Sequence, residues 1–257
     1  MVLHLRTGCW GLRPANTLTP RTAALLDWYA VNRRELPWRD ESDPYRVLVS
    51  EVMLQQTQAS RVVSHYRSFV ERFPTVQALA DGAPADVLAA WQGLGYNRRA
   101  IRLHEAARQI AADGWPPPGE LDRLPGVGPY TAAAVACFAF GTPVAAPDTN
   151  ARRVLSRWEG RALSGRSLWE EAARRLPPEA AAAWNQALMD LGSAVCRPRL
   201  PSSDRCPVAA WCTDPSVYEP PRPQARFEGT TRQAPRAVVS GAATGVPKAK
   251  QATAAAV

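Results

Sequence analysis

Apolar residues recur every three to four positions along most of the chain, which is the spacing of a helix with one buried face. The stretch 21–33 is typical, because Leu25, Trp28 and Tyr29 fall on neighbouring turns. No stretch alternates with the period of two that a half-buried strand requires. We therefore predict an all-α fold. The expected helices span residues 21–33, 45–73, 75–80, 84–92, 98–112, 148–158, 167–176 and 178–196, with a helix–turn–helix over 119–140.

The two ends of the chain differ from this helical body. Residues 1–19 are expected to form an irregular arm, and they lack the apolar run of a secretory signal. Residues 217–257 contain five prolines and neither Leu nor Ile, so they cannot bury a core. We expect a disordered tail over residues 215–257. No run of about 18 apolar residues occurs, so no transmembrane helix is predicted.

The charge of the chain is unevenly distributed. Lys and Arg number 31 against 23 Asp and Glu, a formal net charge of +8 that suits a polyanionic partner. Half of this net charge lies in residues 217–257, which hold six basic and two acidic residues. The only lysines are Lys248 and Lys250. The helical body therefore has no lysine with which to form a Schiff base.

The five cysteines are an odd number in a chain without a secretory signal, so a disulfide framework is not expected. Cys137 lies in an apolar stretch and is expected in the core, whereas Cys9 in the N-terminal arm is expected to be incidental. The remaining three, Cys196, Cys206 and Cys212, lie within seventeen residues and indicate one local site.

The segment from Leu124 to Tyr130 reads Leu-Pro-Gly-Val-Gly-Pro-Tyr and predicts a tight turn between two helices. Gly126 and Gly128 both allow a positive φ and leave backbone N–H groups bare at the start of the next helix. Such a turn binds anions, while Val127 fills the core between the helices. A nucleic-acid phosphate fits this contact, which positions a duplex without reading its bases. The alternative is an ordinary interhelical turn without a ligand.

Residues 124–135, followed by Asp148, resemble the helix-hairpin-helix-Gly-Pro-Asp superfamily of DNA glycosylases. Three more motifs narrow this resemblance to the MutY-type adenine glycosylases: Leu36-Pro-Trp-Arg39, Glu51-Val-Met-Leu-Gln-Gln-Thr-Gln58 and Trp91-Gln-Gly-Leu-Gly-Tyr96. The similarity covers residues 20–214. It implies removal of adenine mispaired with 8-oxoguanine or guanine in double-stranded DNA. It also implies a monomer in the bacterial cytoplasm, associated with the nucleoid and without a membrane partner.

The same resemblance implies a two-lobed helix-hairpin-helix glycosylase fold. A six-helix lobe with the hairpin is expected over residues 42–150. A second helical lobe is expected to combine residues 20–41 with 151–214 and to end in an iron–sulfur-type loop. The DNA would lie in the cleft between the two lobes.

Excision of a purine needs an acid to protonate the leaving base and a carboxylate to stabilise the cationic sugar. On the family pattern, Glu51 protonates adenine N7, Asp148 stabilises the cation and helps to deliver water, and Asn150 orients Asp148 or the water. Glu51 stands among apolar residues, where burial raises its pKa toward the range of a useful acid. The simpler alternatives are a solvated helix carboxylate for Glu51 and a helix N-cap for Asp148.

Tyr130 stands where lyase-type relatives carry a nucleophilic lysine. A tyrosine cannot form an imine with the sugar, so we predict a monofunctional glycosylase that leaves the abasic site unbroken. Tyr130 is expected to hydrogen-bond near the sugar or Glu51. The alternative is an aromatic side chain that only packs on the hairpin.

Adenine must leave the base stack to be reached. The resemblance places Gln55, Gln56 and Gln58, expected within two helical turns of Glu51, at the gap that remains. Tyr96 is expected to contact the DNA as well. The family often has a second tyrosine after this one, where this chain has Asn97.

Trp38, Arg39 and Gln186 are implied to line the adenine pocket. Gln186 lies ten residues before Cys196, at a position whose amide or carboxyl group faces the base in the family. Core packing is the alternative for Trp38.

The family holds a [4Fe–4S] cluster with the pattern Cys-x6-Cys-x2-Cys-x5-Cys. Cys196, Cys206 and Cys212 match its first, third and fourth positions, whereas Ser203 stands at the second. Such clusters ordinarily have four thiolate ligands. The alternatives are a labile cluster on three thiolates, an empty loop, a poor Ser203 alkoxide ligand, or Zn²⁺ on three cysteines.

Glycosylases of this type usually continue into a C-terminal domain that reads 8-oxoguanine, and residues 226–257 do not resemble it. We therefore expect a weaker preference for 8-oxoguanine over guanine. Two other functions stay open: a mismatch thymine glycosylase of the same superfamily, and a catalytically weakened DNA-binding remnant. The Gln-rich motif after Glu51 disfavours the first, and the four matched catalytic positions disfavour the second.

Overall fold

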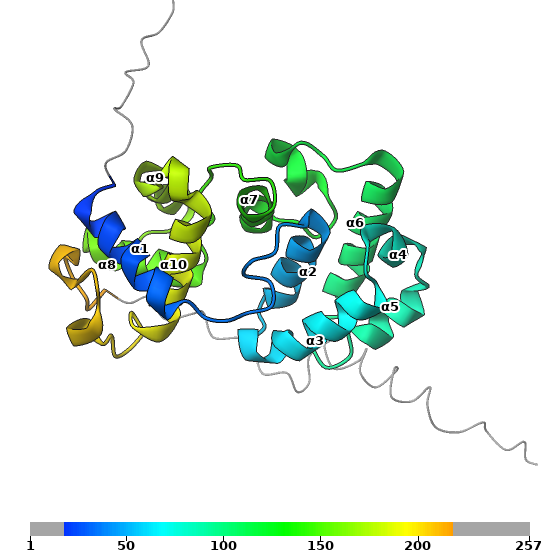
Figure 1. The fold of residues 1–257 in the computed structure, drawn as a ribbon, viewed down its shortest axis with the longest axis horizontal. Helices are drawn as coiled ribbons and strands as arrows, with labels where there is room; N and C mark the ends of the chain where they lie inside the picture. Colours follow the sequence, from blue (N-terminus) through cyan, green and yellow to red (C-terminus); the bar gives the residue numbers. More distant parts are fainter. Residues whose placement is uncertain (1–17, 218–257) are drawn as a thin grey trace, which may run out of the picture. The chain divides into compact units, whose positions relative to one another are not determined.

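The structure, a computed structural model, describes residues 18–217 (Figure 1). The predicted N-terminal arm with Cys9 and nearly all of the predicted tail lie outside the described residues. Within them the chain forms helices and no strand, which confirms the all-α prediction. The α-helices are α1 (Pro20–Asn32), α2 (Pro44–Leu54), α3 (Ala59–Arg72), α4 (Val76–Asp81), α5 (Pro84–Ala90), α6 (Arg98–Asp113), α7 (Pro129–Phe138), α8 (Thr149–Glu159), α9 (Gly165–Arg175) and α10 (Ala181–Ala194). The 3₁₀ turns are η1 (Pro118–Arg123), η2 (Pro178–Ala180), η3 (Ser203–Arg205) and η4 (Ala209–Trp211).

Side-chain caps and prolines fix where several helices begin. At the start of α2, Asp43 accepts a hydrogen bond from the backbone N–H of Tyr45 at 2.8 Å, and Pro44 occupies the first helical position. Thr75 caps α4 in the same way, through the N–H of Ala78. These side chains satisfy donors that the first turn of a helix leaves free.

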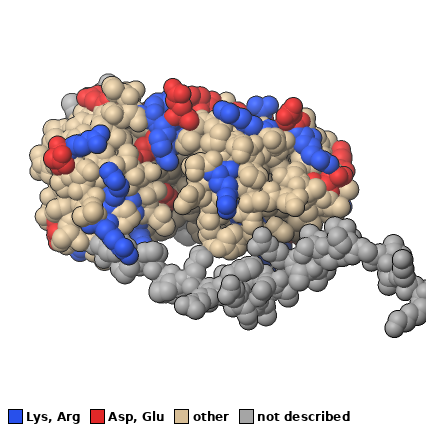
Figure 2. All heavy atoms as spheres, turned by 90° about the horizontal axis from the view of Figure 1, so that it is seen from below, with Lys and Arg blue, Asp and Glu red and all other residues tan. Residues whose placement is uncertain are grey.

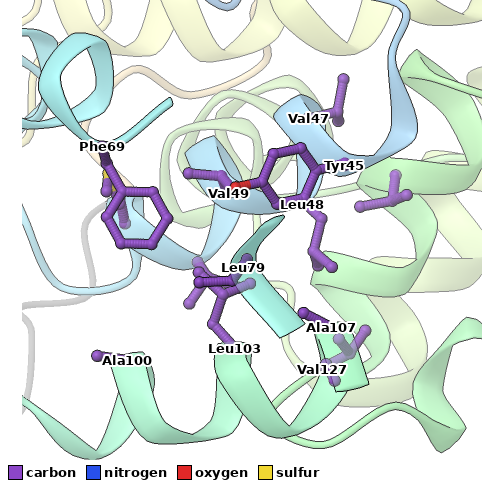
Figure 3. Close-up of a cluster of buried hydrophobic side chains, with 14 of the residues drawn as sticks. Tyr45, Val47, Leu48, Val49, Phe69, Leu79, Ala100, Leu103, Ala107 and Val127 are labelled. Atoms are coloured by element: carbon purple, nitrogen blue, oxygen red, sulfur yellow. The ribbon is translucent and has the colours of Figure 1, made fainter. Parts of the chain in front are cut away.

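The described residues form two separate hydrophobic cores. The helices α2 to α7 pack around the first, where Figure 3 shows side chains of α2, α3, α4 and α6 gathered around Leu79 and Leu103. The second core joins α1 to α8, α9 and α10, with Leu25, Leu155 and Trp184 fully buried in it. Burying each such side chain contributes roughly 1.5–3 kcal/mol, so each core is a substantial source of stability.

The prediction of one continuous helix over residues 45–73 is wrong. The structure has two helices, α2 and α3, separated by a turn in which Gln56 has a φ of +56°. The sequence contains neither Gly nor Pro at this break. Propensity therefore gave no sign of it, and its cause lies in contacts with α6 that are described below.

The helix–turn–helix over residues 119–140 also differs in detail. Its first arm is the 3₁₀ turn η1, and α7 forms the second arm. Gly126 has the expected positive φ of +79°, but Gly128 has a φ of −89° and serves as the N-cap of α7. Only one of the two glycines is therefore required by backbone conformation.

Positive charge is mixed with negative charge on the surface. On the face in Figure 2, Arg side chains are interspersed with Asp and Glu. Several arginines pair with acids one helical turn away, as in Arg102–Glu105 and Arg166–Glu170. Among the described helices, none is long and apolar enough to cross a membrane.

Candidate active site

Glu51 lies on α2 and is almost completely buried, with 6% of its surface exposed. Tyr130, in the first turn of α7, donates a hydrogen bond to it. Burial raises the pKa of Glu51 to about 7, although the Tyr130 hydrogen bond and the charge of Arg39 oppose the rise and Asp148 adds to it. A carboxyl group with this pKa is partly protonated at neutral pH, as a general acid must be.

The Tyr130 hydroxyl stays neutral in this setting. Burial raises its pKa well above the ordinary value, and the neighbouring carboxylates of Glu51 and Asp148 raise it further. A neutral phenol is a hydrogen-bond donor and a poor nucleophile. Tyr130 can therefore hold Glu51 in place but is not suited to attack a sugar.

Asp148 is the N-cap of α8. Its carboxylate accepts hydrogen bonds from the backbone N–H of Ala151 at 2.7 Å and from the side chain of Asn150 at 2.8 Å. Burial raises its pKa, and these hydrogen bonds, together with the charge of Arg153, oppose that rise. The capping role and the proposed catalytic role are thus compatible, because the cap leaves carboxylate lone pairs for a further partner.

Arg153 connects the start of α8 to the cysteine segment. One of its terminal nitrogens donates to the Asn150 side-chain oxygen at 2.8 Å and to the Gly192 carbonyl at 2.6 Å. Its Nε donates to the Cys196 carbonyl at 2.7 Å. The geometry of Asn150, and through it Asp148, therefore depends on where α10 and Cys196 lie.

Gly192 allows α10 to approach the start of α8. A Cβ atom at this position would lie 2.6 Å from the Cβ and 3.0 Å from the Cα of Asn150. Real Cβ atoms do not come so close, so only glycine permits this packing. Asn185, two turns earlier on α10, accepts a hydrogen bond from the N–H of Ala146 and donates one to the Val144 carbonyl, which fixes the segment that leads to α8.

The candidate pocket residues of the 36–39 segment have different environments. Trp38 packs edge-on against Tyr66 within the first core, which is the alternative raised from the sequence. Arg39 is buried and pairs with the fully buried Asp190 of α10. Its Nε is buried and hydrogen-bonds no atom of the described residues. The Nε of Arg39 is therefore a buried donor that no protein atom of the described residues uses.

Two further contacts of α10 belong to the same region. Asp190 also accepts hydrogen bonds from the backbone N–H of Arg34 at 3.0 Å and from its Nε at 2.7 Å. The Tyr29 hydroxyl of α1 donates to the Gln186 side-chain oxygen at 2.5 Å. Because the side-chain oxygen of Gln186 accepts this hydrogen bond, the side-chain N–H₂ group is the part of the amide that does not bond to Tyr29.

The hairpin has an exposed tip over a buried anchor. Val127 is 7% exposed and lies in the first core, while Gly126 and Gly128 are exposed. A Cβ atom on Gly128 would meet nothing within 4 Å, so the space before the N-terminus of α7 is open. Bare N–H groups at a helix start, with open space in front, suit a phosphate oxygen.

The three glutamines do not lie on α2 as expected, because that helix ends at Leu54. They occupy the following turn, where Gln55 donates to the Thr131 hydroxyl of α7 at 3.2 Å and Gln56 is exposed. Gln58 is the N-cap residue of α3 without a side-chain capping bond. Tyr96, also exposed, has a positive φ of +49°.

One cavity of about 90 Å³ is lined by Cys196, Cys206 and Cys212, together with Ser203 and Arg157. Burial raises the pKa values of Cys206 and Cys212, so these thiols stay protonated when nothing binds them. Arg157 is almost fully buried and donates to the Cys196 sulfur at 3.1 Å. As they stand, no three His, Cys, Asp or Glu side chains of the described part are grouped to hold a metal ion. The donor set offers three thiols and one hydroxyl, which does not fit a cluster held by four thiolates.

Sequence reasoning missed Asp190, Gly192, Arg153 and Arg99. A charged residue inside the apolar stretch of α10 was a usable signal for Asp190, because buried carboxylates are paired. Nothing in the local pattern distinguished Arg99 or Arg153 from the many other arginines. Their importance comes from contacts between elements distant in sequence.

Comparison with known proteins identifies relatives of this chain. Residues 49–178 match the HhH-GPD superfamily of base excision DNA repair proteins. The adenine DNA glycosylase of Mycobacterium tuberculosis is 44% identical over 225 residues, which cover 81% of this chain and 74% of that protein. A thermostable thymine-DNA glycosylase structure aligns with a TM-score of 0.70 and 32% identity, covering 75% of this chain and 93% of its own. The structure of a trapped endonuclease III–DNA covalent intermediate aligns with a TM-score of 0.66 at 21% identity, covering 76% of this chain and 93% of its own. The last match supports the fold alone.

Proposed function

This chain belongs to the HhH-GPD superfamily of base excision DNA repair proteins and, within it, to the adenine DNA glycosylases; from this membership we propose its reaction. It hydrolyses the N-glycosidic bond of adenine mispaired with 8-oxoguanine or guanine in duplex DNA. The observation that carries the proposal is the buried Glu51, whose pKa of about 7 suits an acid that acts on the leaving base. The nearby Asp148 supplies the second carboxylate.

Glu51 is the proton donor in this scheme. It protonates N7 of the flipped adenine, so that the base leaves as a neutral species rather than as an anion. Tyr130 fixes the carboxyl group by its hydrogen bond and, as a neutral phenol, forms no adduct. Arg39 limits the rise of the Glu51 pKa, so the carboxyl group stays acidic enough to give its proton to the base, and it regains a proton from water before the next turnover.

Asp148 acts on the sugar. As the C–N bond breaks, positive charge develops on C1′ and the ring oxygen, and a carboxylate close by stabilises it. Asn150 and the N–H of Ala151 hold this carboxylate in one orientation. Water then adds to C1′, its proton leaves to the carboxylate, and the product is an unbroken abasic site.

The hairpin and the adjoining turns hold the DNA. The exposed Gly126–Gly128 tip binds a backbone phosphate through N–H groups at the start of α7. The exposed Gln56 and Tyr96 enter the base stack where the adenine has left. Arg39, through its buried Nε donor, and Gln186, through its amide group, contact the flipped base.

For the cysteine segment we propose a [4Fe–4S] cluster on three thiolates, Cys196, Cys206 and Cys212, with one iron lacking a protein thiolate. The shared cavity and the registry with the family pattern support this. Such a cluster would supply local structure to the segment, and no step of the reaction runs through it. Iron and sulfide analysis of anaerobically purified protein tests the proposal, and protein without iron would contradict it.

Base release under single-turnover conditions tests the reaction. Duplexes with adenine opposite 8-oxoguanine, adenine opposite guanine, and thymine opposite guanine are compared with the same enzyme. We expect release of adenine from the first two and none of thymine. Release of thymine alone would replace the proposal by the mismatch thymine glycosylase, to which the 32% identical structure gives some support. Release of no base from any duplex, with DNA still bound, would identify a binding remnant.

Borohydride trapping tests the monofunctional part of the proposal. The only lysines of the chain are Lys248 and Lys250, so no imine is expected with the abasic sugar. A covalent adduct in high yield on incubation with borohydride would contradict a purely hydrolytic route.

A further inference from the structure

Two turns beside the first core, residues 55–57 and 94–96, each hold a residue with a long side chain in a backbone conformation that usually belongs to glycine. Among the described residues, Gln56 and Tyr96 are the only non-glycine residues with a positive φ, +56° and +49°. Such a conformation costs roughly 1–2 kcal/mol for a residue with a Cβ atom. It persists only where the surroundings fix the backbone, so both turns need a support.

Arg99, in the first turn of α6, contacts both turns at once. Its Nη1 donates to carbonyls at the end of α2 and in the first turn, and its Nη2 reaches both turns. The Nη1 acceptors are the carbonyl oxygens of Val52 (2.9 Å), Met53 (2.8 Å) and Gln55 (2.5 Å). The Nη2 acceptors are the Thr57 hydroxyl (3.0 Å) and the carbonyl oxygens of Gly95 (3.2 Å) and Leu94 (3.4 Å).

These acceptors explain why α2 stops without a glycine. The last carbonyls of a helix have no partner within it and must find one elsewhere. Arg99 supplies that partner for Val52, Met53 and Gln55 together, which releases the chain from helical continuation just before Gln56. The predicted helix over 45–73 failed for this reason.

The guanidinium group of Arg99 also contacts two aromatic rings. Its carbon lies 5.4 Å from the ring centre of Trp91 and 5.5 Å from that of Tyr96. Trp91 is fully buried, so it gives the stack a fixed base. The ring of Tyr96 lies against Arg99, and the residue is 43% exposed, so part of it faces solvent.

We propose that Arg99 is a positioning residue that locks the 55–57 turn and the 94–96 turn into one rigid unit, which presents Gln56 and Tyr96 together to the DNA base stack. This inference rests on the proposed glycosylase function. The Nη1 and Nη2 donors of Arg99 bond to protein atoms, so its role is not that of a phosphate contact. Only a planar group with several N–H donors can serve both turns, and lysine cannot replace it.

The test compares two substrates within each enzyme. The first duplex carries adenine opposite 8-oxoguanine, stacked in the helix. The second carries adenine opposite an abasic-site analogue, where no partner base must be separated from it. The variants are Arg99→Met and Arg99→Lys. Arg108→Met is the matched control, because Arg108 lies on the same helix, is exposed and loses the same charge.

Removing adenine from the base stack costs a few kcal/mol, so loss of the Arg99 contacts that hold the two turns should slow excision of the stacked adenine by about 100-fold. We expect both Arg99 variants to show this loss, with less than about a fivefold loss on the unpaired adenine. Arg108→Met should match the wild type on both duplexes. Equal losses of Arg99→Met on the two duplexes, or wild-type behaviour of Arg99→Lys, would overturn the proposal. Because the comparison is a ratio within one protein, partial unfolding does not produce it.

A second readout separates this proposal from the proposed reaction. In a Glu51→Gln background, which is expected to bind without cleaving, 2-aminopurine replaces the target adenine and its fluorescence reports unstacking. We expect an increase with Glu51→Gln alone and none with the Glu51→Gln, Arg99→Met double variant. An equal increase for both would overturn the role of Arg99 even if adenine excision is established. A wild type that excises no adenine would overturn the reaction, and the fluorescence comparison would still decide the role of Arg99.

Discussion

Helix α8 has a different kind of site at each end. At its start stands the group of residues proposed to be catalytic, Glu51, Tyr130, Asp148 and Asn150, which we call the catalytic cluster. Near its other end, Arg157 lies against the cysteine loop, residues 196–212. In the catalytic cluster, Asp148 accepts hydrogen bonds from Asn150 and from the backbone N–H of Ala151, and Glu51 accepts one from Tyr130. In the cysteine loop, the three thiols of Cys196, Cys206 and Cys212 line a shared cavity.

The difference shows what each region requires in order to work. The catalytic cluster is built from protein atoms alone, so its geometry follows from the packing of α2, α7 and α8. The cysteine loop has three thiols and one hydroxyl, and partial burial raises the pKa of Cys206 and Cys212, so the chemistry of the loop depends on what binds there. Arg153 connects the two regions through Asn150 and the Cys196 carbonyl, and a change in either can reach the other by this contact.

The largest expected effect comes from the catalytic cluster. Glu51→Gln keeps the shape of the side chain and its acceptor for Tyr130, but removes the proton donor. General acid catalysis contributes typically 10²–10⁴-fold, so we expect adenine excision to fall by about 1,000-fold. Single-turnover base release measures this, with gel-shift binding of the same duplex as control. Excision within about threefold of the wild type would show that Glu51 is not the acid.

The same substitution should stabilise the fold at alkaline pH. Burial raises the pKa of Glu51 from the ordinary 4.5 to about 7, so the folded protein binds this proton more tightly than the unfolded chain. Ionised Glu51 therefore opposes folding above pH 7, and the penalty is absent below pH 4.5. Since Gln cannot ionise, the free energy of unfolding should rise by roughly 3 kcal/mol at pH 8 and stay unchanged at pH 4.5. Urea titrations at the two pH values measure it, and an equal change at both would contradict the buried-acid account.

A smaller effect is expected where α10 packs against the start of α8. Gly192→Ala puts a methyl group 2.6–3.1 Å from the Cβ and backbone of Asn150, and neither can move without displacing Asp148. We expect a loss of about 1–3 kcal/mol in stability and about tenfold in excision. Gly119→Ala is the matched control, because a Cβ there meets nothing within 4 Å. Similar melting temperatures and rates for the two variants would show that the close contact has no functional role.

The smallest effect on the reaction is expected in the cysteine loop. Ser203→Cys restores the fourth thiol of the family pattern. We expect more iron per chain and a slower loss of visible absorbance in air, with excision within about twofold of the wild type, because no reaction step uses the cluster. Iron assays with Cys206→Ser as the opposite control measure this. No iron in either the wild type or Ser203→Cys would show that the loop is not a metal site.

The sequence was sufficient for the helical class and for the motifs, because periodicity and short spacings are local properties. It was not sufficient for the break between α2 and α3, which depends on Arg99 more than forty residues away in the chain. It likewise assigned a positive φ to Gly128, although Gly126 alone provides the turn. Asp190 and Gly192 were missed because their roles arise from packing between α10 and other segments, which no pattern along one helix records.

The pH dependence of adenine excision tests the central claim most directly. If Glu51 must be protonated to act, the single-turnover rate constant levels off as the pH falls below 7, as long as Asp148 stays ionised, and it falls tenfold per pH unit above pH 7. Glu51→Gln should remove this dependence together with the activity. A wild-type rate constant that does not change between pH 5 and 9, measured with saturating enzyme, would contradict the assignment of Glu51 as the acid.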